Sequence, residues 1–253
     1  MKLLRVGSII TLAFACLGLG TAAHAVVIDF DGLDSSSTQT PLNLGPGAIA
    51  GNGGTFTEDG FTFSVSVSSN DTPPRAVIFD STCAIGAANP YAACNGDVDL
   101  TPATQGENGI EGNILIVQEQ GSAIPDDAGR PGGTITLTFE DGTPFRFTGA
   151  SIIDDETITI YSVIGGAMIE LASETIGIEG DVGGTALLNA ANGNFIESGI
   201  FQVGDSIVID FSGSGGIDSL VLAPVPLPAA LPLLLSALGG LGLTARLRRK
   251  REA

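Results

Sequence analysis

Short runs of Thr, Ile, Val and Phe alternate with clusters of Gly, Asn, Asp and Pro from residue 26 to residue 224. The runs have the composition of β-strands, and the clusters between them have the composition of turns. No convincing helix interrupts the pattern. About 200 residues usually make one domain. The sequence therefore predicts an all-β domain with about a dozen strands, arranged as an antiparallel β-sandwich or jelly roll.

A hairpin with arms at 55–57 and 61–67 is one such element, because its second arm alternates apolar with hydroxyl residues. This alternation places Phe61, Phe63, Val65 and Val67 on one buried face. Two long polar or Gly-rich connections, 34–54 and 81–111, are expected to be irregular and to have a role of their own. The other expected strands are 26–30, 75–80, 113–118, 133–139, 145–153, 157–163, 167–173, 195–203, 206–211 and 217–222.

The charge balance excludes several classes of function. The chain carries 28 acidic and 10 basic residues, and its formal net charge is -18. Between residues 26 and 245 the basic residues are Arg75, Arg130 and Arg146. Such an acidic surface repels phosphate backbones, which argues against nucleic-acid binding. The single His, His24, lies near the front, which argues against Ser/His/Asp and Cys/His catalysis. We expect no enzyme activity.

The first 25 residues have the organisation of a signal peptide. Lys2 and Arg5 form a basic start, residues 6–20 form an apolar run, and Ala-His-Ala at 23–25 is a small-residue cleavage site. The prediction is that signal peptidase cuts between Ala25 and Val26. An N-terminal membrane anchor is disfavoured because the apolar run is short. A lipoprotein reading through Cys16 is a weaker alternative, since Leu is missing three residues before it.

An apolar segment, residues 229–245, follows a proline-rich stretch and ends at the basic tail 246–251. Seventeen residues rising about 1.5 Å each cover roughly 25 Å as a helix, and about 30 Å if 225–228 join it. The segment shows no polar face beyond one Ser and one Thr, which disfavours a buried core helix. The prediction is a transmembrane helix with the basic tail in the cytoplasm and residues 26–224 outside.

The order of these three C-terminal elements resembles the PEP-CTERM sorting signal, in its VPLPA variant. The resemblance covers residues 225–251, and its motif positions are Val225, Pro226, Leu227, Pro228 and Ala229. Leu227 stands where the commoner pattern has Glu. The resemblance implies recognition by an exosortase, a membrane-bound protease that removes the helix and releases or transfers the body to the cell surface.

The two cysteines that remain after signal removal, Cys83 and Cys94, are expected to form a disulfide in an oxidising exterior. Carboxylates gather at Asp97 and Asp99, at Asp126 and Asp127, and at 154–156. Asp97 and Asp99 project from one face of an extended segment, a spacing that suits calcium. Solvated loop acids are the plainer interpretation of each cluster, so no cofactor is certain and calcium stays a candidate for Asp97, Asp99, Asp126 and Asp127.

The blocks 112–119, 125–127 and 132–139 are similar to β-sandwich ectodomains that often carry PEP-CTERM-type tails. The expected function is that of an exported cell-surface or extracellular-matrix structural or adhesion protein. One alternative is a calcium-dependent carbohydrate-binding module, with extracellular polysaccharide as its partner. A glycoside hydrolase is another, because carboxylate pairs can act as acid and nucleophile. The chain has no Trp and only two Tyr as sugar platforms.

Overall fold

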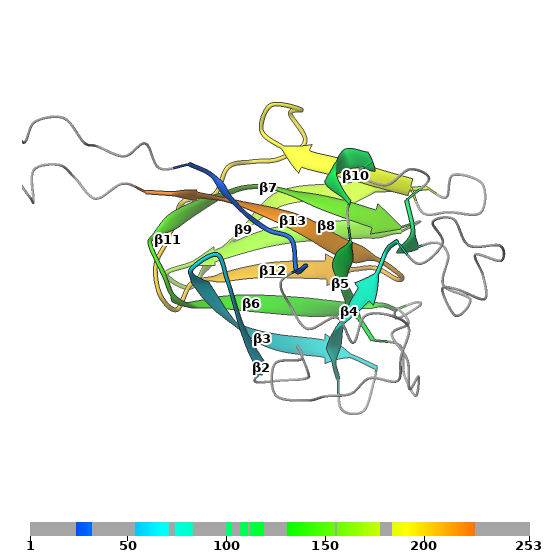
Figure 1. The fold of residues 1–253 in the computed structure, drawn as a ribbon, viewed down its shortest axis with the longest axis horizontal. Coiled ribbons are helices and arrows are strands. Elements are labelled where there is room, and N and C mark those ends of the chain that lie inside the picture. Colours follow the sequence, from blue (N-terminus) through cyan, green and yellow to red (C-terminus); the bar gives the residue numbers. More distant parts are fainter. Residues whose placement is uncertain are drawn as a thin grey trace, which may run out of the picture. The chain divides into compact units, whose positions relative to one another are not determined.

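The structure, a computed structural model, describes residues 24–31, 54–70, 74–82, 100–102, 107–110, 112–118, 131–154, 156–177 and 184–225. His24 to Val225 form one compact unit. The described residues contain strands, turns and a short 3-10 segment, η2 (Glu107–Gly109), with no α-helix among them. The fold is therefore all-β, as the sequence predicts, and its strands form two antiparallel sheets (Figure 1).

Sheet A has the strand order β10-β7-β13-β5-β4, and two short strands lie off this path, β1 beside β13 and β11 beside β7. β1 pairs with β13 beyond the point where β5 ends, so β1 and β5 occupy successive parts of the same edge of β13. β10 and β11 divide the edge of β7 in the same way. The strands are β1 (Val26–Ile28), β4 (Ala76–Asp80), β5 (Asn113–Val117), β7 (Phe145–Asp154), β10 (Gly184–Asn189), β11 (Ile200–Phe201) and β13 (Gly216–Pro224).

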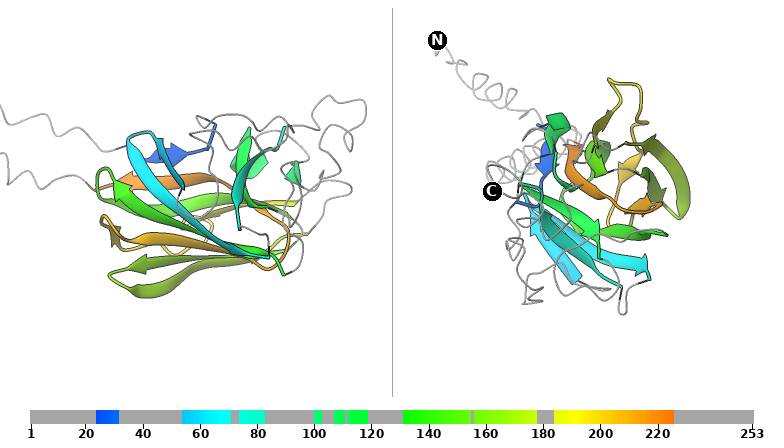
Figure 2. Two further views of the ribbon diagram at one scale, coloured as in Figure 1. Left: turned by 90° about the horizontal axis from the view of Figure 1, so that it is seen from below. Right: turned by 90° about the vertical axis from the view of Figure 1, so that its right-hand side faces the viewer.

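Sheet B has the order β2-β3-β6-β12-β8-β9, and all of its described pairings are antiparallel. The chain passes repeatedly between the sheets, since β6 and β7, like β7 and β8, lie in different sheets. Figure 2 shows most strands of both sheets running in a similar direction. The strands are β2 (Gly54–Glu58), β3 (Phe61–Ser69), β6 (Gly133–Asp141), β8 (Thr157–Ile164), β9 (Ala167–Thr175) and β12 (Ser206–Phe211).

The predicted hairpin is confirmed. β2 pairs with β3 through the two-residue turn Asp59-Gly60, in which both residues have positive φ. A turn of this kind matches the twist of the two strands. Phe61, Phe63, Val65 and Val67 are all buried on one face, and the hydroxyl residues between them are more exposed.

The main core lies between the sheets and is rich in phenylalanine. Phe145 stacks on Phe201 with ring centroids 4.8 Å apart, and it contacts Phe61, Phe63 and Phe139 edge-on. Residues of both sheets belong to this core cluster. The Phe side chains therefore serve packing, as the alternation of the predicted strands indicated.

A second, smaller core covers the outer face of one half of sheet A. Val77, Phe79, Ile114, Ile116 and Ile153 point away from the main core and pack with Leu100 and Ile110. Leu100 and Ile110 belong to the long connection between β4 and β5, and both are fully buried. This part of the connection therefore covers β4 and β5, which explains why nearly all residues of these strands are buried.

The prediction of a strand at 195–203 is wrong for most of its length. Only Ile200–Phe201 form a strand, while β10, which the sequence analysis did not predict, lies at Gly184–Asn189. Ser198 interrupts the ladder because its Oγ accepts the Phe147 amide at 2.8 Å, where a strand would offer a carbonyl. Ile196 instead donates its amide to Leu171 of sheet B at 2.7 Å. The segment thus bridges the edges of the two sheets.

Within the described ranges, no helix combines the length and the apolar character needed to cross a bilayer. The predicted helix 229–245 and most of the predicted signal peptide lie outside those ranges.

Candidate functional site

Most of the residues that the sequence analysis selected lie outside the described residues. These are the cysteine pair, the carboxylates proposed for calcium and all but the first residue of the sorting motif: Cys83, Cys94, Asp97, Asp99, Asp126, Asp127, Pro226, Leu227, Pro228 and Ala229. Among the described residues, no group of three or more His, Cys, Asp or Glu side chains could hold a metal ion.

The predicted signal-cleavage site and the first residue of the predicted sorting motif are described, and the structure brings them to the ends of adjacent strands. Val26, the residue after the predicted signal cleavage, opens β1 and pairs with Leu222 of β13. Ala25 is exposed, whereas Val26 is partly buried against the core. Because the pairing is antiparallel, the beginning of β1 and the end of β13 leave the sheet at the same end (Figure 1). Residues 24–25 and Val225 are therefore neighbours in the fold.

Val225 itself is held by the body. Its backbone amide donates a hydrogen bond of 2.7 Å to the carbonyl of Pro144, and the preceding residue, Pro224, pairs with Phe145. Pro144 is the last residue of the β6–β7 turn, and Phe145 is the first residue of β7. The first residue of the predicted sorting motif thus still belongs to the folded unit, and Pro226 is the next residue along the chain.

Two further turns meet at this end through the carboxylate of Asp205. Its Oδ1 accepts the amide of Gly165 in the β8–β9 turn, and its Oδ2 accepts the amide of Gln202, both at 2.8 Å. The amide of Gly204 donates to Phe139 of β6 at 2.8 Å. We call this part of the molecule the exit end: residues 24–25, the turns 142–144, 165–166 and 202–205, and Val225.

A second group of carboxylates joins β1 to β5 and β2. Phe30 lies two residues after the end of β1. It has a φ of +61°, outside the β region, and its side chain is fully buried. Its amide donates to Oε2 of Glu58 at 3.2 Å, and the amide of Asn113 donates to Oδ1 of Asp31 at 2.7 Å. Asp29 Oδ1 accepts the Asp31 amide at 3.1 Å. In these hydrogen bonds the carboxylates accept from backbone amides, so the group fixes the chain where it leaves β1.

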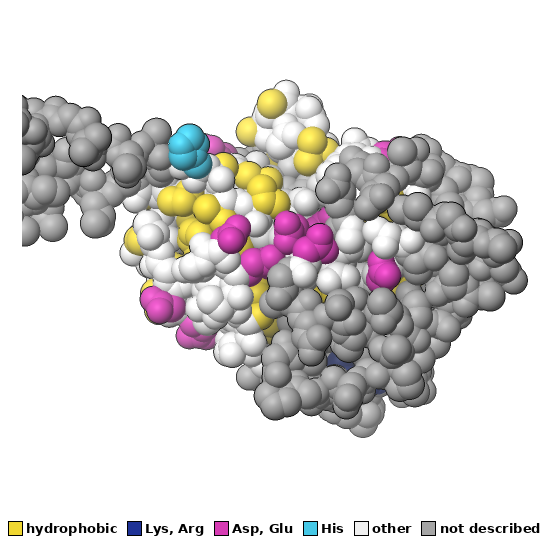
Figure 3. Space-filling view, in the orientation of Figure 1, with side chains coloured by type: hydrophobic (Ala, Val, Ile, Leu, Met, Phe, Trp, Pro, Cys, Tyr) yellow, Lys and Arg dark blue, Asp and Glu magenta, His cyan; other side chains and the backbone are white. Residues whose placement is uncertain are grey.

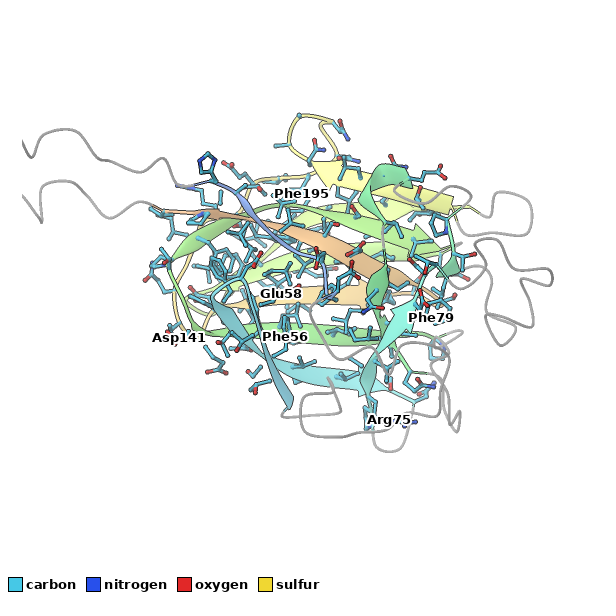
Figure 4. The ribbon with its side chains drawn as sticks, viewed as in Figure 1. Phe56, Glu58, Arg75, Phe79, Asp141 and Phe195 are labelled. Carbon is cyan, nitrogen blue, oxygen red and sulfur yellow. The ribbon has the colours of Figure 1, made fainter. Side chains whose placement is uncertain are left out.

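Carboxylates recur on the molecular face shown in Figure 3, and Figure 4 shows Glu58 near Phe56, beneath the end of β1. The sequence analysis did not single out Asp29, Asp31 or Glu58. Their positions at the ends of predicted strands were the available signal, because a carboxylate at such a position often accepts a backbone amide.

A fully buried carboxylate, Asp218, lies on β13 opposite Ser151 of β7. Beside it, Ser151 Oγ donates to the carbonyl of Asn108 at 2.7 Å, and Ser219 Oγ donates to that of Gly109 at 2.9 Å. These bonds attach η2 to the outer face of sheet A. The sequence signal was an Asp-Ser pair inside an otherwise apolar strand, a position at which a buried polar group needs a partner.

No family model matches the chain, and a search of curated proteins finds no match. The functional assignment therefore depends on the residues and their arrangement.

Proposed function

We propose that the chain is an exported structural or adhesion protein of the cell surface or extracellular matrix, delivered by an exosortase-type system. On this proposal signal peptidase removes residues 1–25, and residues 229–245 form a transmembrane helix that holds the precursor with its basic tail in the cytoplasm. The body would be a jelly-roll-like sandwich on the outer side of the membrane.

One observation supports this topology above the others. β1 and β13 are paired antiparallel, so the first residue after the signal and the first residue of the sorting motif leave the body at one end. On this proposal the domain is tied to the membrane by its C-terminus, and its N-terminus follows a signal that is cut in the same membrane. Because both ends lie on one side of the body, neither end needs a long connection. A body with its ends on opposite sides would need one.

The arrangement of carboxylates supports a structural role over a catalytic one. Asp31, Asp205 and Glu58 each accept hydrogen bonds from backbone amides that close turns and strand ends. The rings that could form a sugar platform are mostly inside, since the stacked Phe residues are buried. The proposed partners are signal peptidase, an exosortase-type protease, the membrane and extracellular polysaccharide.

Mass spectrometry of the protein isolated from the surface of the producing cells tests the proposal. We expect a mature chain that begins at Val26 and lacks the Arg/Lys-rich tail 246–251. A double substitution, P226A/P228A, should leave the body folded but keep the tail attached, because it removes both prolines of the motif that the protease is proposed to recognise. A matched control, P74A, changes a proline of the body that precedes β4, outside both the motif and the exit end, and should be processed normally. A mature surface protein with an intact tail would contradict the proposal.

A further inference from the structure

Three exposed apolar side chains lie at or beside the exit end. Val203, in the turn before β12, is 63% exposed, and Met168 and Ile169, close to the β8–β9 turn, are 60% and 52% exposed. The hydrogen bond from Gly165 to Asp205 holds the two turns together. Exposed apolar side chains that cluster mark contact sites.

The chain leaves the fold at this same end. Val225 is bonded to Pro144 at the start of β7, and Phe145 pairs with both Pro224 and Phe201. Phe201 and Pro224 therefore flank Phe145 from its two sides in sheet A. Val203 follows Phe201 by two residues, so it lies close to the end of the sheet at which β13 ends. Met168 pairs with Val163, which in turn pairs with Ser206, the first residue of β12. All three side chains thus lie within about three residues of the end from which the tail departs, with Met168 and Ile169 on opposite faces of β9 because they are successive residues of one strand.

The length of the connection identifies what faces this end. Four residues, 225–228, separate the last strand residue from the apolar segment 229–245. From Val225 to Ala229 a fully extended chain reaches about 14 Å at roughly 3.5 Å per residue. The headgroup layer on each side of a bilayer is itself about 5–8 Å thick. A body tied this closely to a membrane segment has its exit end within reach of the headgroups.

We propose that the exit end is a membrane-contacting surface, in which Met168, Ile169 and Val203 enter the headgroup layer of the bilayer that holds the precursor. This inference rests on the proposed transmembrane anchoring of residues 229–245. Contact with the headgroup layer orients the body with its strands away from the membrane and keeps the motif 225–229 at the bilayer surface, within reach of a membrane-bound protease.

The charges of this end select the kind of lipid. Glu140, Asp141 and Glu170 are exposed around the turns, and Figure 4 shows Asp141 at the side of the sandwich from which β1 and β13 depart. Arg146, the described basic residue nearest to the exit, is exposed and donates its Nη1 to the carbonyl of Ser198 at 3.1 Å. The contact therefore depends on apolar insertion, and zwitterionic headgroups suit it better than anionic ones.

The absence of Trp from the chain permits a direct test with single-Trp reporters. M168W and V203W place the indole at the exit end, and T175W is the matched control. Thr175 pairs with Thr157, and Met168 pairs with Val163. Thr157 and Val163 are six residues apart on β8, so the side chains of Thr175 and Met168 point to the same face of sheet B. Six residues span about 20 Å. Both positions are exposed, so each reporter fits without repacking the core.

The full chain would be reconstituted in phosphatidylcholine vesicles, with and without brominated acyl chains, and separated by flotation. Bromine quenches only nearby indoles, so we expect M168W and V203W to be quenched at least twofold more than T175W. Equal quenching of all three reporters in floated vesicles overturns the membrane contact alone. Failure of the unmodified chain to float overturns the proposed anchoring and the contact with it. A lipid-independent, concentration-dependent blue shift of M168W would assign the surface to a second copy of the chain and overturn the proposal.

Discussion

The backbone amide of Asn113 donates a hydrogen bond of 2.7 Å to Oδ1 of Asp31. Asn113 opens β5 and is 6% exposed, and Asp31 follows the end of β1. Because β1 and β5 occupy successive parts of one edge of β13, this bond closes the joint between them. The side-chain amide of Asn113 adds a longer contact of 3.4 Å to the carbonyl of Phe30.

Replacing Asp31 by Ala should destabilise the body, because the buried amide of Asn113 loses its acceptor. We expect a loss of about 1–3 kcal/mol in the free energy of unfolding. D31N keeps an oxygen at the same position and should cost less than half as much. Urea unfolding, followed by circular dichroism, measures both. E170A, which removes an exposed carboxylate, is the control and should stay within about 0.5 kcal/mol of the original chain. Equal costs for D31A and E170A would contradict the assigned role.

Gly112, next to Asn113, has a φ of +65°, and a Cβ added to it would overlap the carboxylate of Asp31. G112A should therefore cost the strain of a left-handed residue, about 1–2 kcal/mol, together with the displacement of Asp31. G166A is the matched control: Gly166 has a φ of +83° but nothing within 4 Å of the added Cβ. The difference between the two variants in urea unfolding isolates the displacement. Equal losses would show that Asp31 moves aside freely.

Most strands could be predicted because the apolar residues of each strand recur at the positions that face the core. β3 alternates buried Phe and Val with hydroxyl residues, and β6 follows the same rule with Ile135, Leu137 and Phe139. β10 escaped prediction because three of its six residues, Thr185, Ala186 and Leu187, are partly exposed in succession, which leaves no period of two. Its place depends on pairing with β7, whose paired residues lie 30 to 40 positions earlier in the chain.

The segment 195–203 shows the opposite case. It is rich in Phe, Ile and Val, as strands are, yet the hydroxyl of Ser198 takes the hydrogen bond that a strand would give to a neighbouring carbonyl. Local pattern cannot show such a competition between a side chain and the ladder. The pairing of β1 with β13 could not be predicted either, because no residue pattern in either strand indicates which strand it pairs with. The predicted calcium ligands and the disulfide remain predictions.

Ser198 offers a test of that competition. Its Oγ accepts the amide of Phe147 at 2.8 Å and donates to the carbonyl of Gly199 at 2.8 Å, and the residue is 2% exposed. S198A leaves the Phe147 amide without this acceptor, so we expect a loss of about 1–3 kcal/mol. S173A removes a hydroxyl that bonds to another on the surface and should cost far less. Amide exchange at Phe147 should accelerate in S198A and stay unchanged in S173A; protection of Phe147 in both would contradict the assignment.

Phe145 is the centre of the aromatic core, with four other rings within 6.1 Å of its centroid. F145A should lower the free energy of unfolding by about 3–5 kcal/mol, because both the transfer free energy and a cavity are lost. I196A removes a side chain that is 63% exposed and should change stability by less than about 1 kcal/mol. Thermal and urea unfolding of the two variants provide the comparison. A small effect of F145A would mean that the core rearranges around the missing ring.

Removal of the chain after Val225 should leave the body intact, because residues 24–225 form one compact unit and Val225, bonded to Pro144, is its last residue. A chain of residues 26–225 should therefore unfold cooperatively, with a free energy within about 0.5 kcal/mol of that of the uncut protein in detergent. Truncation after residue 215 is the contrasting variant. It removes β13, which lies between β7 and β5 and pairs with β1, so the interior of sheet A is lost and we expect no cooperative transition. If 26–225 failed to fold, the tail would be part of the domain and its removal could not release a stable product.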